Sequence, residues 1–261
     1  MLAKEFHKKV LSKFSTAGQR YSELSSIQAE VARDLSARIP LKPGDMVLDI
    51  GCGAGDLAAD ISRRAPGVQV IGLDGAEGML ASAKSQYPLV PWIKGDALHL
   101  PCRAWSFDMV VSSSSYQWVP DLKNAFCESC RVLRRDGRFY AAFFGRRTLC
   151  EFFESLEYAA LAFQRKDVFL LKRLPSEADV RAALKQTNFR HRGVALETRE
   201  VVFRDFLGLF RWLKGIGANS LGSFYFGKNL FEEAGRYYKE HYGTENGIKA
   251  TFEVIWVDAV K

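Results

Sequence analysis

The stretch that most constrains the fold is Val47-Leu-Asp-Ile-Gly-Cys-Gly-Ala-Gly55, an apolar segment that runs into alternating glycines. A strand that ends in glycines and continues into a helix lets the backbone approach a ligand closely and presents free N–H groups at the helix N-terminus. The spacing excludes two common nucleotide sites. Asp56 stands where a nicotinamide fingerprint needs its third glycine, and the Gly-Lys-Ser/Thr of a phosphate-binding P-loop is absent.

Apolar stretches of strand length alternate with segments of helical periodicity along most of the chain. This alternation predicts right-handed β-α-β crossovers and a mainly parallel sheet with helices on both faces. We interpret residues 1–261 as one domain, with a helical part over 1–40, a strand–helix core over 41–148 and a region over 149–261 that closes the sheet after a helical insertion. The predicted strands are Met46–Ile50, Val68–Leu73, Trp92–Lys94, Met109–Ser112, Arg138–Phe144, Val194–Phe203 and Ala250–Val260.

The composition is that of an ordinary globular protein, since 48 % of the 261 residues are hydrophobic and 26 % are charged. No apolar run reaches the ~18 residues of a membrane span, and the first ten residues carry charges where a secretory signal would be apolar. We therefore expect a cytoplasmic protein outside the membrane. The net charge of +7 suits an anionic ligand or an acidic partner, and without a basic-aromatic patch we expect no nucleic acid.

Cysteine and histidine are too scattered to predict a metal site. Cys127 and Cys130 form a single C-x-x-C within a helical pattern, with no second cysteine pair and no histidine near them in sequence. A tetrahedral zinc site needs four ligands, so helix packing is the better interpretation of this pair.

Small and acidic residues follow the ends of several predicted strands. Asp49 lies within the first strand, and the residues that follow five strand ends are Gly51, Asp74, Asp96, Ser112 and Gly145. In an open α/β sheet the ligand binds outside the carboxyl ends of the strands, where a carboxylate after the second strand can accept bonds from both ribose hydroxyls. Loop composition alone can place such residues after strands, but five in register favour a ligand site at one rim.

These motifs resemble those of the class I methyltransferases that use S-adenosylmethionine. The resemblance rests on the glycine stretch, on Gly72-Leu-Asp-Gly-Ala-Glu-Gly-Met-Leu80, on Gly95-Asp-Ala-Leu-His-Leu-Pro101 and on Ser106-Phe-Asp-Met-Val-Val111. It implies a Rossmann-like, seven-stranded sheet and S-adenosylmethionine as co-substrate without a metal. The glycines would line the methionine end, Asp74 would hold the ribose, and Met79, Asp96 and Ala97 would contact adenine. The implied cofactor-binding residues are Asp49, Gly51, Gly53, Gly55, Asp74, Met79, Asp96, Ala97, Ser112 and Gln117.

Segments outside the core resemble a narrower family, the malonyl-acyl-carrier-protein O-methyltransferases of biotin synthesis. They are Phe14-Ser-Thr-Ala-Gly-Gln-Arg-Tyr21 with Gln28, Ser112-Ser-Ser-Ser-Tyr-Gln-Trp118, Leu213-Lys-Gly-Ile-Gly-Ala-Asn219 and Thr251-Phe-Glu-Val-Ile-Trp256. This resemblance implies methyl transfer to the free carboxylate of malonyl-acyl carrier protein, with malonyl coenzyme A as an alternative acceptor. The product would be the malonyl methyl ester that starts pimeloyl synthesis for biotin.

Such a reaction needs positioning and no general base. A malonyl carboxylate is ionised at neutral pH, because carboxyl pKa values lie near ~4. The enzyme has to align the carboxylate with the methyl group and exclude water, which is a task for an N-terminal helical lid. The resemblance places Tyr21 at the inner face of that lid, with a core aromatic as the alternative interpretation.

Two groups of arginines flank the fifth predicted strand. Arg146 and Arg147 follow it at the active rim, where a guanidinium would orient the substrate carboxylate, unless both are simply exposed on a loop. The basic run that precedes the strand is expected at the far rim or on a solvated helix face. It consists of Arg131, Arg134, Arg135 and Arg138.

Proteins with other functions share the same cofactor motifs. These alternatives are methyltransferases of other small acids or quinone precursors, and S-adenosylmethionine-binding factors of respiratory-complex assembly. We expect a monomer, and an acidic carrier protein as partner, because a basic enzyme attracts an acidic protein.

Overall fold

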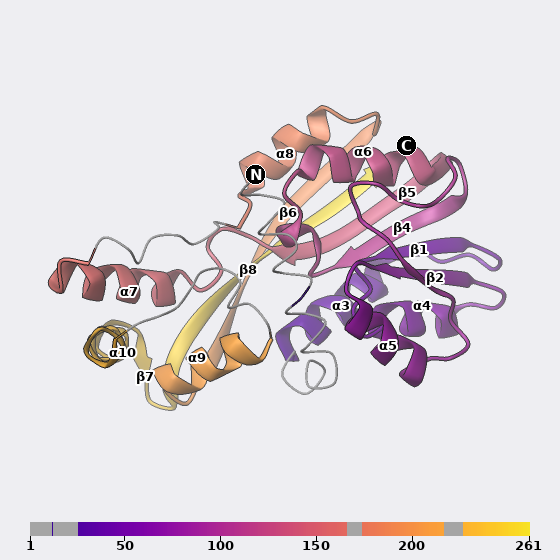
Figure 1. Cartoon of the computed structure of the whole chain (residues 1–261). Coiled ribbons are helices and arrows are strands. Elements are labelled where there is room, and N and C mark those ends of the chain that lie inside the picture. Colours follow the sequence, from indigo (N-terminus) through magenta and orange to yellow (C-terminus); the bar gives the residue numbers. More distant parts are fainter. Residues whose placement is uncertain (1–11, 13–25, 166–173, 217–226) are drawn as a thin grey trace.

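The computed structural model describes Ser12 and residues 26–165, 174–216 and 227–261. Within these ranges the strands form one sheet in the order β3-β2-β1-β4-β5-β8-β6, and the short β7 pairs with β8 (Figure 1). Strands β1 to β5 run parallel, whereas β8 runs antiparallel to both β5 and β6. The strands are β1 (Met46–Ile50), β2 (Gln69–Asp74), β3 (Trp92–Lys94), β4 (Phe107–Ser113), β5 (Leu133–Phe144), β6 (His191–Phe203), β7 (Gly243–Thr244) and β8 (Gly247–Val260).

Helices cover both faces of this sheet (Figure 1). On one face lie α3 (Ser26–Arg38), α4 (Asp56–Arg64) and α5 (Glu77–Gln86), and on the other lie α6 (Leu122–Val132) and α8 (Glu177–Lys185). In β1, Val47 packs in the core on the α3 and α4 side, and Leu48 packs in the core on the α6 and α8 side. Strands covered on both faces are almost continuously apolar, which is why the sequence pattern locates them so well.

The β6–β8 ribbon extends beyond the other strands and carries a second group of helices (Figure 1). This group consists of α7 (Cys150–Ala162), α9 (Phe206–Gly215) and α10 (Lys228–Tyr242). The Phe206 ring lies 5.3 Å from that of Phe152, 4.9 Å from Phe231 and 5.5 Å from Tyr238. An aromatic cluster therefore joins the three helices at the end of the ribbon.

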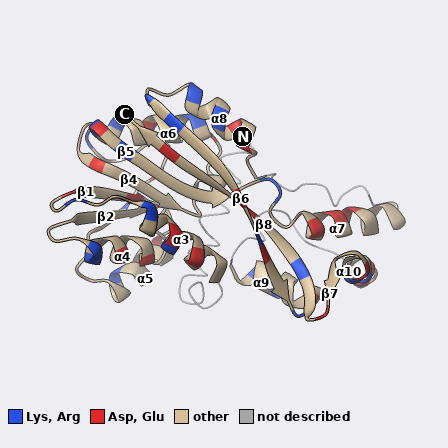
Figure 2. Cartoon of the chain, turned by 180° about the vertical axis from the view of Figure 1, so that it is seen from behind, with Lys and Arg blue, Asp and Glu red and all other residues tan. Residues whose placement is uncertain are grey.

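Charged residues of both signs are spread over the elements (Figure 2). The charged side chains of α7 are all acidic, at Glu151, Glu154 and Glu157, whereas basic residues lie on α6 and α8. Among the described elements, both signs of charge therefore occur on the side of the molecule that Figure 2 shows.

The largest difference from the predicted elements lies at the start of β5. The sequence pattern places its first residue at Arg138, whereas the strand begins at Leu133, directly after α6. The register with β4 jumps from Phe107↔Leu133 to Met109↔Arg138, so residues 134–137 bulge out of the ladder. A bulge breaks the two-residue periodicity, and the sequence therefore does not reveal where this strand starts.

Most of the predicted N-terminal lid, including Tyr21, lies outside the described residues. Most of its described part is α3, whose Ile27, Val31 and Leu35 are buried against the sheet. In the described part of the chain, no helix is both long and apolar enough to cross a membrane.

Candidate active site

A cavity of about 340 Å³ opens at the carboxyl ends of β1, β2, β3 and β4. This is the rim at which an open α/β sheet binds its ligand. The ends of the four strands and the loops that follow them supply much of its wall, through residues 51–54, 74–76, 95–97 and 113–115. Helix α3 contributes Gln28, Ala29 and Ala32 from another side.

Three glycines form the turn between β1 and α4. Gly51, Gly53 and Gly55 have φ of 70°, 54° and 95°, a backbone that residues with a side chain rarely adopt. A Cβ on Gly51 would overlap the side chain of Ser115, and one on Gly55 would meet the ring of Trp92. A Cβ on Gly53 would have no described atom within 4 Å. Gly53 therefore borders open cavity, and a side chain there would extend into this space.

Asp74, the last residue of β2, ties this glycine turn to the neighbouring strand. Its Oδ2 accepts a hydrogen bond from the backbone N–H of Gly53 (2.9 Å), and its Oδ1 accepts one from Ala76 (2.7 Å). Burial raises the pKa of Asp74, and the backbone N–H groups around it offset part of the rise. Since each carboxylate oxygen has two lone pairs, Asp74 can still accept hydrogen bonds from a ligand.

Asp49 lies in β1 beneath the glycine turn, lines the cavity and is 1 % exposed. Neither of its carboxylate oxygens has a hydrogen-bond partner of normal geometry among the described residues. Burial raises its pKa to about 8, aided by the charge of Asp74 and partly offset by the backbone N–H of Ala58. A buried carboxylate ionises readily only beside a positive charge, so the cavity fits a ligand with a cationic group close to β1.

The cavity brings together most of the predicted cofactor-binding residues. Gly55 lies next to it as the N-cap of α4. Ser112 and Gln117 are buried but are not among the lining residues, and the Ser112 hydroxyl donates to the carbonyl oxygen of Ile50 at 2.7 Å. A cofactor role for these two residues stays a prediction. The predicted residues that line the cavity are Asp49, Gly51, Gly53, Asp74, Met79, Asp96 and Ala97.

The cavity wall also contains residues that the sequence analysis did not assign to the site. Gln28 on α3 is 8 % exposed, and its Oε1 has no partner among the described residues. The sequence signal that could have assigned Gln28 to the site is its place in the N-terminal segment that resembles the narrower family. Residues 113–115 line the cavity where Ser112 does not, because β4 runs one residue beyond its predicted end.

The two predicted substrate arginines follow β5, and neither is among the described residues that line the cavity. Arg146 reaches α8, where its Nη2 lies 2.8 Å from Oδ2 of Asp179. Arg147 is exposed and donates its backbone N–H to the buried Glu253 at 3.3 Å. Arg146 is therefore engaged in an ion pair, whereas no ion-pair partner of Arg147 lies within the described ranges. Their role toward the substrate stays a prediction.

The described cavity wall contains no histidine or tyrosine. The wall contains Lys94, whose Nζ lies 3.1 Å from the carboxylate of Glu77. It also contains Cys52, and burial raises the pKa of this thiol well above the ordinary value. Within the described ranges, no group of three or more His, Cys, Asp and Glu side chains is placed to hold a metal ion. The described wall is suited to bind a cation because it contains the buried carboxylate of Asp49.

Comparison with known proteins extends these observations. Residues 48–141 match the family described as a methyltransferase domain. The chain is 32 % identical over 261 residues to malonyl-[acyl-carrier protein] O-methyltransferase of Geobacter sulfurreducens, covering 95 % of this chain and 97 % of that protein. It is 29 % identical over 242 residues to the mitochondrial arginine-hydroxylase NDUFAF5 of Danio rerio, covering 90 % and 73 %. The YcgJ protein of Bacillus subtilis has a similar structure, with a TM-score of 0.64, 20 % identity and coverage of 89 % and 98 %.

The mainly parallel sheet, the glycine turn at its rim and the matched domain define a class I methyltransferase, an enzyme whose fold supports S-adenosylmethionine as co-substrate. The similarity to the Geobacter sulfurreducens protein goes well beyond this domain. The chain belongs to the family of malonyl-[acyl-carrier protein] O-methyltransferases. The fold class and the family predicted from the sequence are thereby confirmed.

Proposed function

We propose that the enzyme transfers a methyl group from S-adenosylmethionine to the free carboxylate of malonyl-acyl carrier protein, giving the methyl ester that starts pimeloyl synthesis for biotin. One observation carries the proposal. The similarity to the Geobacter sulfurreducens enzyme extends over almost the whole of both chains, far outside the matched domain of residues 48–141. Segments outside that domain are where enzymes that share a cofactor differ in substrate.

The cavity wall has groups suited to each part of the cofactor. Asp49 would face the positively charged amino group, and Asp74 would accept hydrogen bonds from the ribose hydroxyls. Asp96 and Ala97, together with Met79, would border the adenine. When bound, S-adenosylmethionine supplies a methyl group on a sulfonium sulfur, which a carboxylate attacks without losing a proton. The open space at Gly53 leaves room for the methionine end beside the glycine turn.

A carboxylate is a methyl acceptor that suits a cavity shielded on one side from water. Such a nucleophile is ionised at neutral pH, so the enzyme needs no general base. Water exclusion favours a reaction in which opposite charges cancel, and α3 shields one side of the cavity.

A panel of acceptors tests the proposal. The purified enzyme is offered malonyl carrier protein, malonyl coenzyme A, trans-aconitate and a quinone precursor, each with S-adenosylmethionine. We expect the highest kcat/KM on malonyl carrier protein and lower but measurable turnover of malonyl coenzyme A. Turnover of the last two acceptors alone would contradict the proposal.

A second candidate function is assembly of a respiratory complex through modification of a protein. The observation that favours it is the 29 % identity to NDUFAF5, which covers most of both chains. Rescue of a biotin-requiring strain that lacks its early methyltransferase separates the two functions. We expect rescue, which an assembly factor would not give.

A further inference from the structure

The loop between β3 and β4 carries three cavity residues, Gly95, Asp96 and Ala97, at its start. Apart from an isolated bridge between Asp96 and His99, the loop forms no strand or helix. Backbone N–H and C=O groups that find no partner within the loop therefore need one from other parts of the chain.

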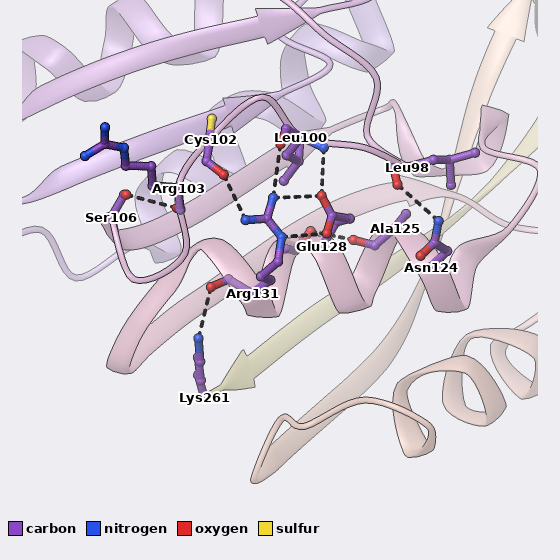
Figure 3. A network of polar contacts seen from close by, with 11 residues as sticks. Leu98, Leu100, Cys102, Arg103, Ser106, Asn124, Ala125, Glu128, Arg131 and Lys261 are labelled. Atoms are coloured by element: carbon purple, nitrogen blue, oxygen red, sulfur yellow. Dashed lines mark hydrogen bonds and ion pairs between the residues drawn. The ribbon is translucent and has the colours of Figure 1, made fainter.

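Helix α6 supplies such partners through the ion pair between Glu128 and Arg131 (Figure 3). Arg131 donates from Nη1 to the carbonyl oxygen of Cys102 (2.8 Å) and from Nη2 to that of Leu100 (3.0 Å). Glu128 accepts a hydrogen bond from the backbone N–H of Leu100 at 2.8 Å. The two side chains also bind each other, with Arg131 Nε 2.6 Å from Glu128 Oε1. Hydrogen bonds that involve an ionised group are stronger than neutral ones, so this pair holds the loop firmly.

The contacts between α6 and the loop extend to the cavity residue Asp96. Asn124, one turn before Glu128, donates to the carbonyl oxygen of Leu98 at 3.1 Å. The backbone N–H of Leu98 donates in turn to Oδ1 of Asp96 at 2.9 Å. A continuous chain of contacts thus runs from α6 to the carboxylate of Asp96.

Helix α6 is itself a fixed support. Ala125 and Phe126 on its inner face are completely buried in the core. At its end, Lys261 Nζ donates to the carbonyl oxygens of Arg131 (3.1 Å) and Leu133 (2.7 Å). The position of Asp96 is therefore set by the core of the protein through α6.

We propose that Asn124, Glu128 and Arg131 are positioning residues for the nucleoside end of the cofactor, because together they hold the loop that places Asp96 where it can select the adenine base. None of the three is among the described residues that line the cavity, so they act through the loop. The inference rests on the proposed function, since it takes an S-adenosyl compound as the ligand. Arg131 was expected at the far rim or on a solvated helix face, and it lies in the last turn of α6, where its partly exposed side chain also binds the loop.

The test measures base selectivity as well as affinity. S-adenosylhomocysteine and S-inosylhomocysteine differ where adenine has an amino donor and hypoxanthine has a carbonyl acceptor. A carboxylate held in place accepts from the donor and repels the acceptor. We expect Arg131→Met to weaken binding of S-adenosylhomocysteine about tenfold in calorimetry, the loss typical of one charge-assisted contact. We also expect the ratio of the two dissociation constants to fall toward unity.

The chain offers a matched control. Arg134 makes a comparable ion pair with Asp108, at 2.6 Å, and does not contact the loop. Arg134→Met removes the same charge and should leave both dissociation constants unchanged. Arg131→Lys keeps the charge but cannot span both carbonyls and Glu128, so its selectivity should be intermediate.

Asn124→Ala provides a milder variant should Arg131→Met fail to fold. It removes one contact to Leu98, and we expect a smaller loss in the same direction. Unchanged affinity and selectivity in folded Arg131→Met, or in Asn124→Ala if that variant alone folds, would overturn the inference. Equal losses in Arg134→Met would also overturn it. Failure of the unmodified enzyme to bind either homocysteine compound would instead contradict the proposed function.

Discussion

The backbone N–H of Gly53 donates a hydrogen bond to Oδ2 of Asp74 over 2.9 Å, and this contact joins the ends of β1 and β2. The glycine that leaves room in the cavity and the carboxylate proposed to hold the ribose thus support each other. Because the contact is partly buried, losing the carboxylate also frees the N–H that positions the turn. The two halves of the site therefore act as one unit.

Asp74→Ala should weaken binding of S-adenosylmethionine by about 1.5–3 kcal/mol, the usual value of hydrogen bonds to a charged group. Calorimetry measures the change directly. Asp136→Ala, at the start of β5 on the opposite rim, is the control and should bind normally. Unchanged affinity in Asp74→Ala would place the ribose contact elsewhere.

Changes at two glycines should have different consequences. Gly53→Asn suits the positive φ better than other side chains and fills open space, so the protein should fold and bind S-adenosylmethionine at least about tenfold more weakly. Gly51→Ala should lower the melting temperature, because its Cβ would overlap Ser115. Thermal unfolding and calorimetry on both variants check this. Normal binding by folded Gly53→Asn would show that the ligand lies elsewhere.

The raised pKa of Asp49 predicts that ligand binding is linked to a proton. Below about pH 8 the carboxyl of the free enzyme is mostly protonated, and it ionises when a cation binds beside it. Binding should therefore release a proton, and affinity should rise with pH up to about 8. Calorimetry in two buffers of different ionisation enthalpy measures this proton, which Asp49→Asn should abolish. The same heat in both buffers would refute the linkage.

The same group affects the stability of the ligand-free enzyme. Its folded-state pKa of about 8 lies above the ordinary value of 3.8, so the folded protein binds more protons than the unfolded chain between these values. The free energy of unfolding should therefore fall as pH rises through this window and level off above it. Asp49→Asn should show a shallower fall in denaturant unfolding across the same pH range. An identical pH profile in the variant would assign the effect to other groups.

Arg147 is the better candidate to orient the substrate carboxylate, because the Arg146 guanidinium already pairs with Asp179. Arg147→Ala should lower kcat/KM on malonyl carrier protein roughly 30- to 1000-fold. This corresponds to a loss of about 2–4 kcal/mol of transition-state stabilisation. Its affinity for S-adenosylmethionine should stay normal. Arg146→Ala, the matched control, should mainly lose a half-exposed ion pair, worth about 1 kcal/mol or less in stability. Near-normal turnover by Arg147→Ala would move the carboxylate contact elsewhere, with Tyr21 the next residue to test.

The sequence predicts those parts of the molecule that depend on local pattern. Val47, Leu48 and Ile50 are apolar because helices cover both faces of β1, and this made the strand visible. Asp74 and Asp96 could be assigned to one rim because parallel strands bring their carboxyl ends together.

Contacts between distant segments could not be predicted in the same way. Asp179 lies 33 residues from Arg146, and no periodicity links them. Arg131 stands in a run of arginines typical of a solvated surface, yet it binds the loop that carries Asp96. Such pairings depend on how the helices pack on the sheet, which one sequence does not reveal.

Transfer of a labelled methyl group tests the central claim most directly. The enzyme is incubated with S-adenosylmethionine labelled in its methyl group and with malonyl carrier protein, and the carrier is analysed by mass spectrometry before and after mild alkali. Acetyl carrier protein, which lacks the free carboxylate, is the control. We predict that malonyl carrier protein gains one labelled methyl group that alkali removes, and that acetyl carrier protein gains none. Label on both carriers, on neither, or in an alkali-stable form would contradict the account.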